Sequence, residues 1–143
     1  ILRCLVGSEM CIRDSCRAAA RITGPLLWRD MRFGDQVCRP EELGDVILGR
    51  KDCAASYHIA VVVDDAAQGV THVSRGEDLF PVTGIHRTLQ ALLGLPVPQW
   101  YHHRLVKDAS GKRLAKRDRS LSLQEMRAAG MRPEDVFRLM RES

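Results

Sequence analysis

The sequence predicts an α/β domain with a mainly parallel sheet, and three observations support this prediction. Ile59 to Val63 is a continuous apolar, mostly β-branched run, which is typical of a strand buried on both faces. A short Gly-containing connection leads from it to a second apolar run, Val70 to Val73. A helical pattern and a further strand candidate follow, and this β-helix-β order favours a right-handed crossover within a parallel sheet.

The residues before Ile59 contain candidates for a helix, a hairpin and a strand. Cys16 to Thr23 is rich in Ala and Arg and is expected to end a helix, which Gly24 and Pro25 stop. Residues 26–35 are expected to form a hairpin-like excursion around a Gly-containing turn. After a polar loop at residues 40–45, Val46 to Leu48 is a short strand candidate followed by a turn.

The strongest helix signal in the chain extends from Thr83 to Leu93. Thr83 is the expected N-cap, Ile85 and the following leucines make one apolar stripe, and Gly94 occupies the C′ position. Trp100 to Val106 is the next strand candidate, in which successive side chains alternate between faces. His102 and His103 would therefore point to opposite faces, and Trp28 and Trp100 are interpreted as packing residues.

The C-terminal part of the chain predicts two short helices. Ser122 and Glu125 have the spacing of a capping box and open a helix that is expected to end at Gly130. Pro133 is expected to lie in the first turn of a second helix that reaches about Met140. The architecture is therefore expected to change near Asp118, with an α/β unit over residues 16–118 and the start of a helical segment over 119–143.

Residues 1–15 are excluded from this reasoning. The twelve residues from Cys4 to Ser15 resemble the translation of a common transposase sequencing-library adapter, so we expect them not to be native. The alternative is a short amphipathic N-terminal tail. If the adapter interpretation holds, the natural N-terminus is missing.

Composition bounds the class of protein. The chain has 143 residues and a formal net charge of +4, which predicts one domain with a hydrophobic core and is compatible with a polyanionic partner. No apolar run approaches the ~20 residues of a membrane span. Outside the first fifteen residues, Cys16, Cys38 and Cys53 are odd in number and widely spaced. This favours a reducing, cytoplasmic setting and argues against a disulfide framework or a metal site in this chain.

A basic segment follows the last strand candidate. Five cations fall in the nine residues from Gly111 to Arg119, directly after a turn at residues 108–111. Such a loop suits phosphate, because cations offset the charge that grows on phosphoryl oxygens and a loop can close over its ligand. A solvated charge run beside a domain edge is the alternative interpretation.

Several ordered motifs resemble those of a known family. The first is Ser56-Tyr57-x-Ile59-Ala60-Val61-Val62-Val63-Asp64-Asp65, and the second is Gly69-Val70-Thr71-His72-Val73-x-Arg75-Gly76-x-Asp78-Leu79. The turn at residues 92–96 and the loop at 111–117 complete the set. Together they resemble the C-terminal half of the catalytic domain of glutamyl-tRNA-type class I aminoacyl-tRNA synthetases, over roughly residues 26–140. The resemblance implies a Rossmann-like fold.

Within that family the likeness is greatest to the branch whose members attach glutamate to the modified base queuosine in tRNA(Asp). The segments at residues 65–69 and 76–79 are similar to that branch. The chain also stops soon after the basic loop, without the anticodon-binding domain of a full glutamyl-tRNA synthetase. Two alternatives remain: a fragment of a full glutamyl-tRNA synthetase, and a non-catalytic basic RNA-binding module.

The resemblance implies roles for particular residues. Residues 113–117 resemble the Lys-Met-Ser-Lys-Ser loop of class I synthetases, with Arg113 at its first basic position and Lys116 at its second lysine. Lys116 would bind the phosphates of ATP, whereas Ala115 replaces the usual serine. Tyr57 and Arg75 match glutamate contacts, Arg75 as a charged fork for a carboxylate, and His102 matches a residue that lines the ATP pocket.

The implied reaction joins glutamate to ATP, with Mg²⁺ expected, and then transfers the activated glutamate to tRNA(Asp). It needs positioning and electrostatics but no covalent enzyme nucleophile. The ATP-cradling motif and a zinc site of many members would lie in an N-terminal half outside this chain, so the fragment is expected to be inactive alone. We expect a monomer that does not bind membranes.

Simpler interpretations stay open for several polar residues. For His102 and His103, an ordinary position at a strand end is the alternative. His58, His72 and His86 are expected to be structural. Asp64 and Asp65 are expected to cap a turn after the first strand, because the implied chemistry needs no acid/base pair.

Overall fold

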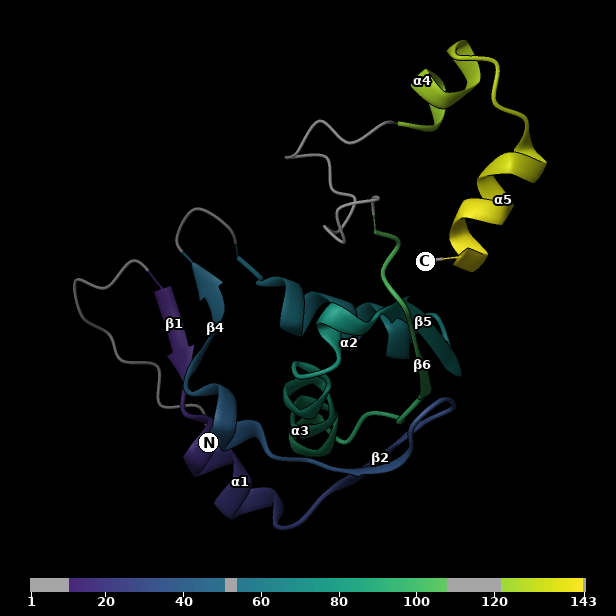
Figure 1. Ribbon diagram of the computed structural model, residues 1–143. Helices are drawn as coiled ribbons and strands as arrows, with labels where there is room; N and C mark the ends of the chain where they lie inside the picture. Colours follow the sequence, from purple (N-terminus) through teal and green to yellow (C-terminus); the bar gives the residue numbers. More distant parts are fainter. Residues whose placement is uncertain (1–10, 51–53, 108–121, 143) are drawn as a thin grey trace. The chain divides into compact units, whose positions relative to one another are not determined.

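The computed structural model describes residues 11–50, 54–107 and 122–142, and Figure 1 shows its elements in chain order. The chain divides into two compact units. The first contains Ile1–Arg75 and Leu79–His102, and the second contains Gly76–Asp78 and His103–Ser143. Each unit is described by itself below.

A four-stranded sheet with the strand order β3-β2-β6-β5 organises the first unit. Its strands are β2 (Leu27–Asp30), β3 (Gly34–Val37), β5 (His72–Gly76) and β6 (Gln99–His103). β2 and β3 form an antiparallel hairpin, in which Asp30 lies opposite Gly34. β2 and β6 are parallel, with Asp30 opposite Trp100. The sheet thus places the ends of two strands that are distant in sequence side by side.

A separate two-stranded antiparallel sheet joins β1 (Cys11–Asp14) to β4 (Val46–Arg50). Strand pairing needs only the backbone N–H and C=O groups that any non-proline residue supplies. The pairing of β1 therefore does not show whether its residues are native, and the adapter origin of residues 1–15 stays a prediction. The short strand expected at Val46 is confirmed, but it continues to Arg50, into the residues where a turn was expected. The polar loop before it contains a 3₁₀ turn, η1 (Pro40–Leu43).

Three helices enclose the core of this unit: α1 (Cys16–Thr23), α2 (Tyr57–Ala67) and α3 (Thr83–Leu93). α3 packs against both α1 and α2, and α2 also packs against β4. Their shared core is a cluster of buried apolar side chains contributed by Cys16, Leu48, Val62, Ile85 and Leu89. The predicted C-terminal ends of α1 and α3 are confirmed, with Gly94 in the left-handed conformation at φ 64° after α3.

The prediction of a buried strand from Ile59 to Val63 was wrong, because these residues lie within helix α2. A short apolar run does not by itself distinguish a buried strand from a buried helix segment. The helix continues through Asp64 and Asp65, so these two residues do not cap a turn after a strand. Val62 is 2% exposed whereas Val63 is 44% exposed, which is the one-sided burial of a helix that packs on a core.

Other boundaries moved by a few residues. The strand expected from Val70 begins at His72 and ends at Gly76, and the strand expected to reach Val106 ends at His103. The N-cap of α3 is Val82 rather than Thr83. The hydroxyl group of Thr83 accepts a hydrogen bond from Arg75, as described below, and makes no capping bond to its own helix.

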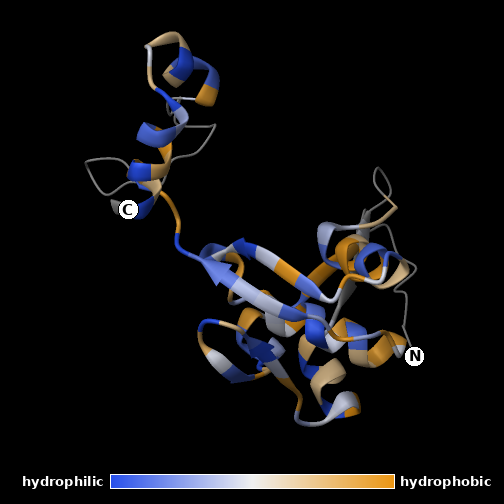
Figure 2. Cartoon of the chain, turned by 90° about the vertical axis from the view of Figure 1, so that its right-hand side faces the viewer, coloured by the Kyte–Doolittle hydropathy of each residue, from blue (hydrophilic) through white to orange (hydrophobic). Residues whose placement is uncertain are grey.

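The second unit contains α4 (Leu123–Ala128) and α5 (Pro133–Glu142). The predicted capping box is confirmed: the Ser122 hydroxyl accepts from the backbone N–H of Glu125, and the Glu125 carboxylate accepts from that of Ser122. Pro133 occupies the start of α5 as predicted. Figure 2 shows hydrophobic and hydrophilic residues alternating around both helices, which is the pattern of amphipathic helices.

Among the described helices, none is both long and apolar enough to cross a membrane.

The core cluster predicts the result of a matched pair of substitutions on α3. Leu89 is 5% exposed and Leu93 is 44% exposed. We expect Leu89→Ala to lower the free energy of unfolding by about 2–5 kcal/mol, because it removes buried contacts and leaves a cavity. Leu93→Ala is the control, with an expected change below about 1 kcal/mol. Urea unfolding followed by circular dichroism measures both, and equal losses would mean that α3 does not pack as described.

Candidate active site

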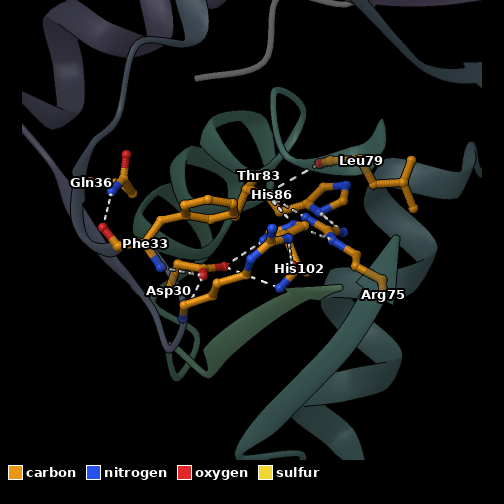
Figure 3. Close-up of polar contacts among 9 residues, drawn as sticks. Asp30, Phe33, Gln36, Arg75, Leu79, Thr83, His86 and His102 are labelled. Carbon is orange, nitrogen blue, oxygen red and sulfur yellow. Dashed lines mark hydrogen bonds and ion pairs between the residues drawn. The ribbon is translucent and has the colours of Figure 1, made fainter. Parts of the chain in front are cut away.

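A buried arginine on the sheet is the centre of the candidate site. Arg75, on β5, is 9% exposed, and its guanidinium group meets three side chains (Figure 3). Nε donates to Nε2 of His102 at 3.1 Å, and Nη2 donates to the hydroxyl oxygen of Thr83 at 2.6 Å. Nη1 lies 3.0 Å from Nδ1 of His86. These contacts fix the plane of the guanidinium group on both of its edges.

A carboxylate lies behind His102. The Nδ1 atom of His102 is 2.6 Å from Oδ2 of Asp30, and both side chains are fully buried. The other oxygen of Asp30 accepts the backbone N–H groups of Arg32 and Phe33, at 2.8 and 2.9 Å. Asp30 therefore closes the turn between β2 and β3 while it contacts β6, the neighbouring parallel strand.

A second branch of the site leads from Arg75 to the surface. His86 lies between Arg75 and His58, whose Nδ1 atom is 3.1 Å from Nε2 of His86. The ring of Tyr57 lies against both imidazoles, with centroid distances of 5.7 Å to each. Tyr57 is 51% exposed, so this branch connects a buried cation to a tyrosine ring that solvent reaches.

Aromatic rings surround the buried half of the site. Phe80 contacts His102 edge to face at 5.1 Å, and Trp28 contacts Phe80, Trp100 and His102 at 5.0, 5.6 and 5.8 Å. The expected packing role of the two tryptophans is confirmed, since both are buried. An apolar enclosure of this kind strengthens the electrostatic interactions inside it.

Burial and the arginine set the protonation of the site. Burial, and after it the charge of Arg75, lowers the pKa of His86 to about 3, so this imidazole is neutral at pH 7. Burial alone would raise the pKa of the Asp30 carboxyl group. The hydrogen bonds from His102 and from the backbone N–H groups of Phe33 and Arg32 outweigh burial, and the pKa of Asp30 is lowered. Asp30 is therefore an ionised carboxylate at neutral pH.

The structure brings together three of the five site residues that the sequence predicted. Arg75, His102 and Tyr57 belong to one cluster, with His86 between Arg75 and Tyr57. Tyr57 reaches it from the first turn of α2 rather than from a strand end. The predicted ATP contact of His102 stays a prediction; its ring faces Asp30, Arg75 and Thr83. Arg113 and Lys116 lie outside the described residues.

Sequence reasoning did not select Asp30 or Thr83 for the site, and it interpreted His86 as structural. The spacing of Thr83 and His86, three residues apart on one helix, does place both on one face, which is a usable signal. Asp30 carries no such local signal, because its partner His102 is 72 residues away in sequence.

No group of three or more metal-ligating His, Cys, Asp or Glu side chains occurs in the part of the chain that the structure describes. Cys38 contacts the carbonyl oxygen of Gly84 at 3.0 Å, and burial raises the pKa of its thiol. Cys16 is a buried core residue, and Cys53 lies outside the described residues.

The arrangement suits the recognition of a carboxylate. A guanidinium group that is held in one orientation can form paired hydrogen bonds with the two oxygens of a carboxylate. An adjacent tyrosine can donate a further hydrogen bond. A charged fork of this kind favours ligands that carry a carboxylate over their uncharged analogues.

Comparisons with known proteins agree with this chemistry. The family profile described as "tRNA synthetases class I (E and Q), catalytic domain" matches residues 6–142. A glutamyl-Q tRNA(Asp) synthetase of Rhodobacter capsulatus is 58% identical over 106 residues, or 71% of this chain and 38% of that protein. A glutamate–tRNA ligase 2 of Nitratiruptor is 34% identical over 129 residues, 90% of this chain and 28% of that protein.

Solved structures show the same fold. The crystal structure of glutamate-tRNA synthetase from Elizabethkingia anophelis superposes with a TM-score of 0.57 at 30% identity, covering 66% of this chain and 19% of that one. The fold and the profile together define part of a class I aminoacyl-tRNA synthetase catalytic domain. The chain belongs to the glutamate and glutamine (E and Q) family of class I tRNA synthetases, and the predicted α/β, Rossmann-like fold is confirmed. It spans little more than a third of the length of the Rhodobacter relative.

The lowered pKa of His86 predicts a pH dependence of stability. The folded state keeps His86 neutral down to about pH 3, whereas the unfolded chain protonates it near 6.5. The unfolded state thus binds more protons between these values, so stability is fully present above pH 6.5 and is lost as pH falls, by up to about 1.4 kcal/mol per pH unit. Urea unfolding at several pH values measures this slope.

His86→Gln should flatten the slope in that range, while His103→Gln, an exposed histidine on β6, should leave it unchanged. His58, whose pKa burial and Arg75 also lower, contributes in the same direction and leaves a residual slope in the His86 variant. A wild-type slope in His86→Gln would show that His86 is not held neutral.

Proposed function

We propose that this chain is the glutamate-binding part of a ligase that activates glutamate with ATP and transfers it to queuosine in tRNA(Asp). One observation supports the proposal above all others. Arg75, in a chain of the E and Q family, is held by the side chains of His102, Thr83 and His86. Aromatic rings surround His102, and the ring of Tyr57 lies against His86. Because the chain covers a minor part of its relatives, this activity belongs to the complete protein.

Arg75 and Tyr57 have distinct roles in this proposal. The guanidinium group binds the side-chain carboxylate of glutamate, which selects glutamate over the uncharged glutamine. The tyrosine hydroxyl donates a hydrogen bond to the same ligand. Holding the side chain in this way leaves the α-carboxylate in position for reaction, and fixed orientation of this kind is a large source of rate.

The proposed reaction has two steps. An oxygen of the glutamate α-carboxylate attacks the α-phosphorus of ATP, and pyrophosphate leaves to give glutamyl-adenylate. A hydroxyl group of queuosine then attacks the activated carbonyl carbon, and AMP leaves. Charge grows on pyrophosphate in the first step, and the cations of the basic segment, with Lys116 foremost and Arg113 beside it, are proposed to offset it together with Mg²⁺.

A full glutamyl-tRNA synthetase is the second candidate, and one comparison favours it. The match to the Nitratiruptor glutamate–tRNA ligase 2 extends over 90% of this chain, against 71% for the Rhodobacter relative. The identities point the other way, at 34% and 58%. Both candidates require the same glutamate site, so the acceptor distinguishes them.

The deciding experiment offers the full-length gene product two acceptors, tRNA(Asp) that contains queuosine and tRNA(Glu). Transfer of radiolabelled glutamate to the first supports the proposal, and transfer to the second supports the alternative. Salt-dependent tRNA binding without glutamate-dependent ATP–pyrophosphate exchange would instead indicate a non-catalytic RNA-binding module.

Arg75→Gln tests the glutamate site. We expect it to lower kcat/KM for glutamate about 100-fold or more in ATP–pyrophosphate exchange with tRNA present, because it removes a charged hydrogen-bond fork. Arg29→Gln is the matched control, since Arg29 is an exposed arginine that pairs with Asp35 on the hairpin, and its rate should stay within about twofold. An unchanged rate in Arg75→Gln would remove glutamate binding from Arg75.

Lys116→Ala tests the basic segment. We expect it to slow adenylate formation by about 100-fold, because one cation that stabilises the leaving pyrophosphate is lost, with little effect on the free energy of unfolding. Lys107→Ala, at an exposed lysine before this segment, is the control. A wild-type exchange rate in Lys116→Ala would exclude Lys116 from the mechanism.

A further inference from the structure

We propose that Asp30 is a positioning residue that fixes the tautomer of His102 and, through it, the orientation of the Arg75 guanidinium group. The role of Asp30 in fixing the tautomer of His102 is argued from the contacts in the site alone. The effect of Asp30 on glutamate binding rests on the function proposed above. Asp30 lies on a different strand from Arg75, and both contact the same imidazole from opposite sides (Figure 3).

The first step is the contact between Asp30 and His102. An ionised carboxylate only accepts hydrogen bonds, so the 2.6 Å contact between Oδ2 of Asp30 and Nδ1 of His102 requires a proton on Nδ1. The backbone N–H of His102 also points to Oδ2, at 3.3 Å. Asp30 thus holds the ring and determines which of its nitrogens bears hydrogen.

The second step is the contact between His102 and Arg75. A guanidinium group only donates, so the bond from Nε of Arg75 to Nε2 of His102 at 3.1 Å requires a lone pair on Nε2. The imidazole is then neutral, with hydrogen on Nδ1 and an acceptor on Nε2. The alternative tautomer, or an imidazolium ion, would set an N–H group against the N–H of Arg75.

His86 satisfies the same requirement with its other nitrogen. Nη1 of Arg75 approaches Nδ1 of His86 at 3.0 Å, so this imidazole accepts at Nδ1 and carries hydrogen on Nε2, which faces His58. The Thr83 hydroxyl oxygen accepts from Nη2. Its own hydrogen can be donated to Nε2 of His102 at 3.2 Å, which also calls for a lone pair on Nε2, or to the carbonyl oxygen of Leu79 at 3.3 Å. Arg75 is thus oriented by three acceptors, and Asp30 controls the one that holds Nε.

The two oxygens of Asp30 have separate tasks, which makes a clean variant possible. Oδ1 accepts two backbone N–H groups in the hairpin turn, and Oδ2 faces His102. In Asp30→Asn the amide oxygen can keep both backbone bonds, so the NH₂ group faces His102. Because an NH₂ group donates, Nδ1 of His102 must then accept, and the imidazole hydrogen moves to Nε2. The N–H group at Nε2 would face the Nε–H group of Arg75, which can no longer donate to it. Loss of the correct tautomer by the same Asp-to-Asn change is known from serine proteases.

The first measurement is the tautomer of His102 in this chain at pH 7, from the imidazole ¹⁵N shifts in long-range ¹H–¹⁵N NMR spectra. We expect hydrogen on Nδ1 in the wild type and on Nε2 in Asp30→Asn. Asp35→Asn is the control, because it removes the same negative charge from an exposed carboxylate of the same hairpin. It should leave the hydrogen of His102 on Nδ1. An imidazolium ion or an Nε2 tautomer in the wild type would overturn the inference, as would an unchanged tautomer in Asp30→Asn.

The second measurement is kinetic and uses the full-length gene product. Asp30→Asn should raise KM for glutamate about tenfold or more, while KM for ATP stays within about twofold, because only the carboxylate fork is displaced. In a His102→Gln background, where the side-chain carbonyl can accept from Arg75, the added effect of Asp30→Asn should fall below about twofold. If Asp30→Asn acted through a general folding defect, its effect on KM would be the same in the His102→Gln background as in the wild type.

The two proposals fail separately. If Arg75→Gln raises KM for glutamate and Asp30→Asn does not, the positioning role is wrong and glutamate binding by Arg75 stands. If Arg75→Gln itself has no effect on glutamate, the proposed function is wrong, and the tautomer measurement still decides whether Asp30 orients Arg75. If Asp30→Asn does not fold, the wild-type tautomer alone supports or overturns the inference.

Discussion

The structure of the first unit depends on the accommodation of one buried cation. The guanidinium group of Arg75 and the carboxylate of Asp30 are both taken out of water, and they are joined by an imidazole rather than by direct contact. Buried charges are costly unless they are paired and hydrogen-bonded, so β2, β6 and β5 must lie side by side in that order. Helix α3 completes the set by supplying Thr83 and His86 from its first turn. The sheet order and the position of α3 therefore meet the same electrostatic requirement.

The sequence predicted those elements whose signals are local. The C-terminal ends of α1 and α3, the capping box at Ser122 and the start of α5 depend on residues within one or two turns, and all are confirmed. Helix α2 was predicted as a strand because Ile59 to Val63 satisfies both patterns, and packing on α3 and β4 decides between them. Tyr57 and Arg75 were found through a family motif. Asp30 was not found, because its role depends on a strand pairing between residues 70 positions apart.

In the function proposed above, the candidate site binds the side-chain carboxylate of glutamate, which both candidate enzymes must recognise. The comparisons extend to both glutamyl-Q tRNA(Asp) synthetases and glutamate–tRNA ligases. A shared amino-acid site beside different acceptor sites would let one catalytic-domain fold serve more than one nucleic-acid substrate, since function resides in sites carried by a common fold.

The parallel pairing of β2 with β6 has a consequence for how the protein folds. Contacts in the site join residues separated by as many as 72 positions, and closing such long loops costs entropy before the contacts repay it. We therefore expect the cluster around Arg75 to assemble after α3 and the hairpin, whose contacts are local in sequence. During synthesis, α3 and the hairpin can form before β6 has left the ribosome, whereas the contacts of His102 cannot, because His102 lies on β6. Completion of the sheet and completion of the buried cluster therefore coincide.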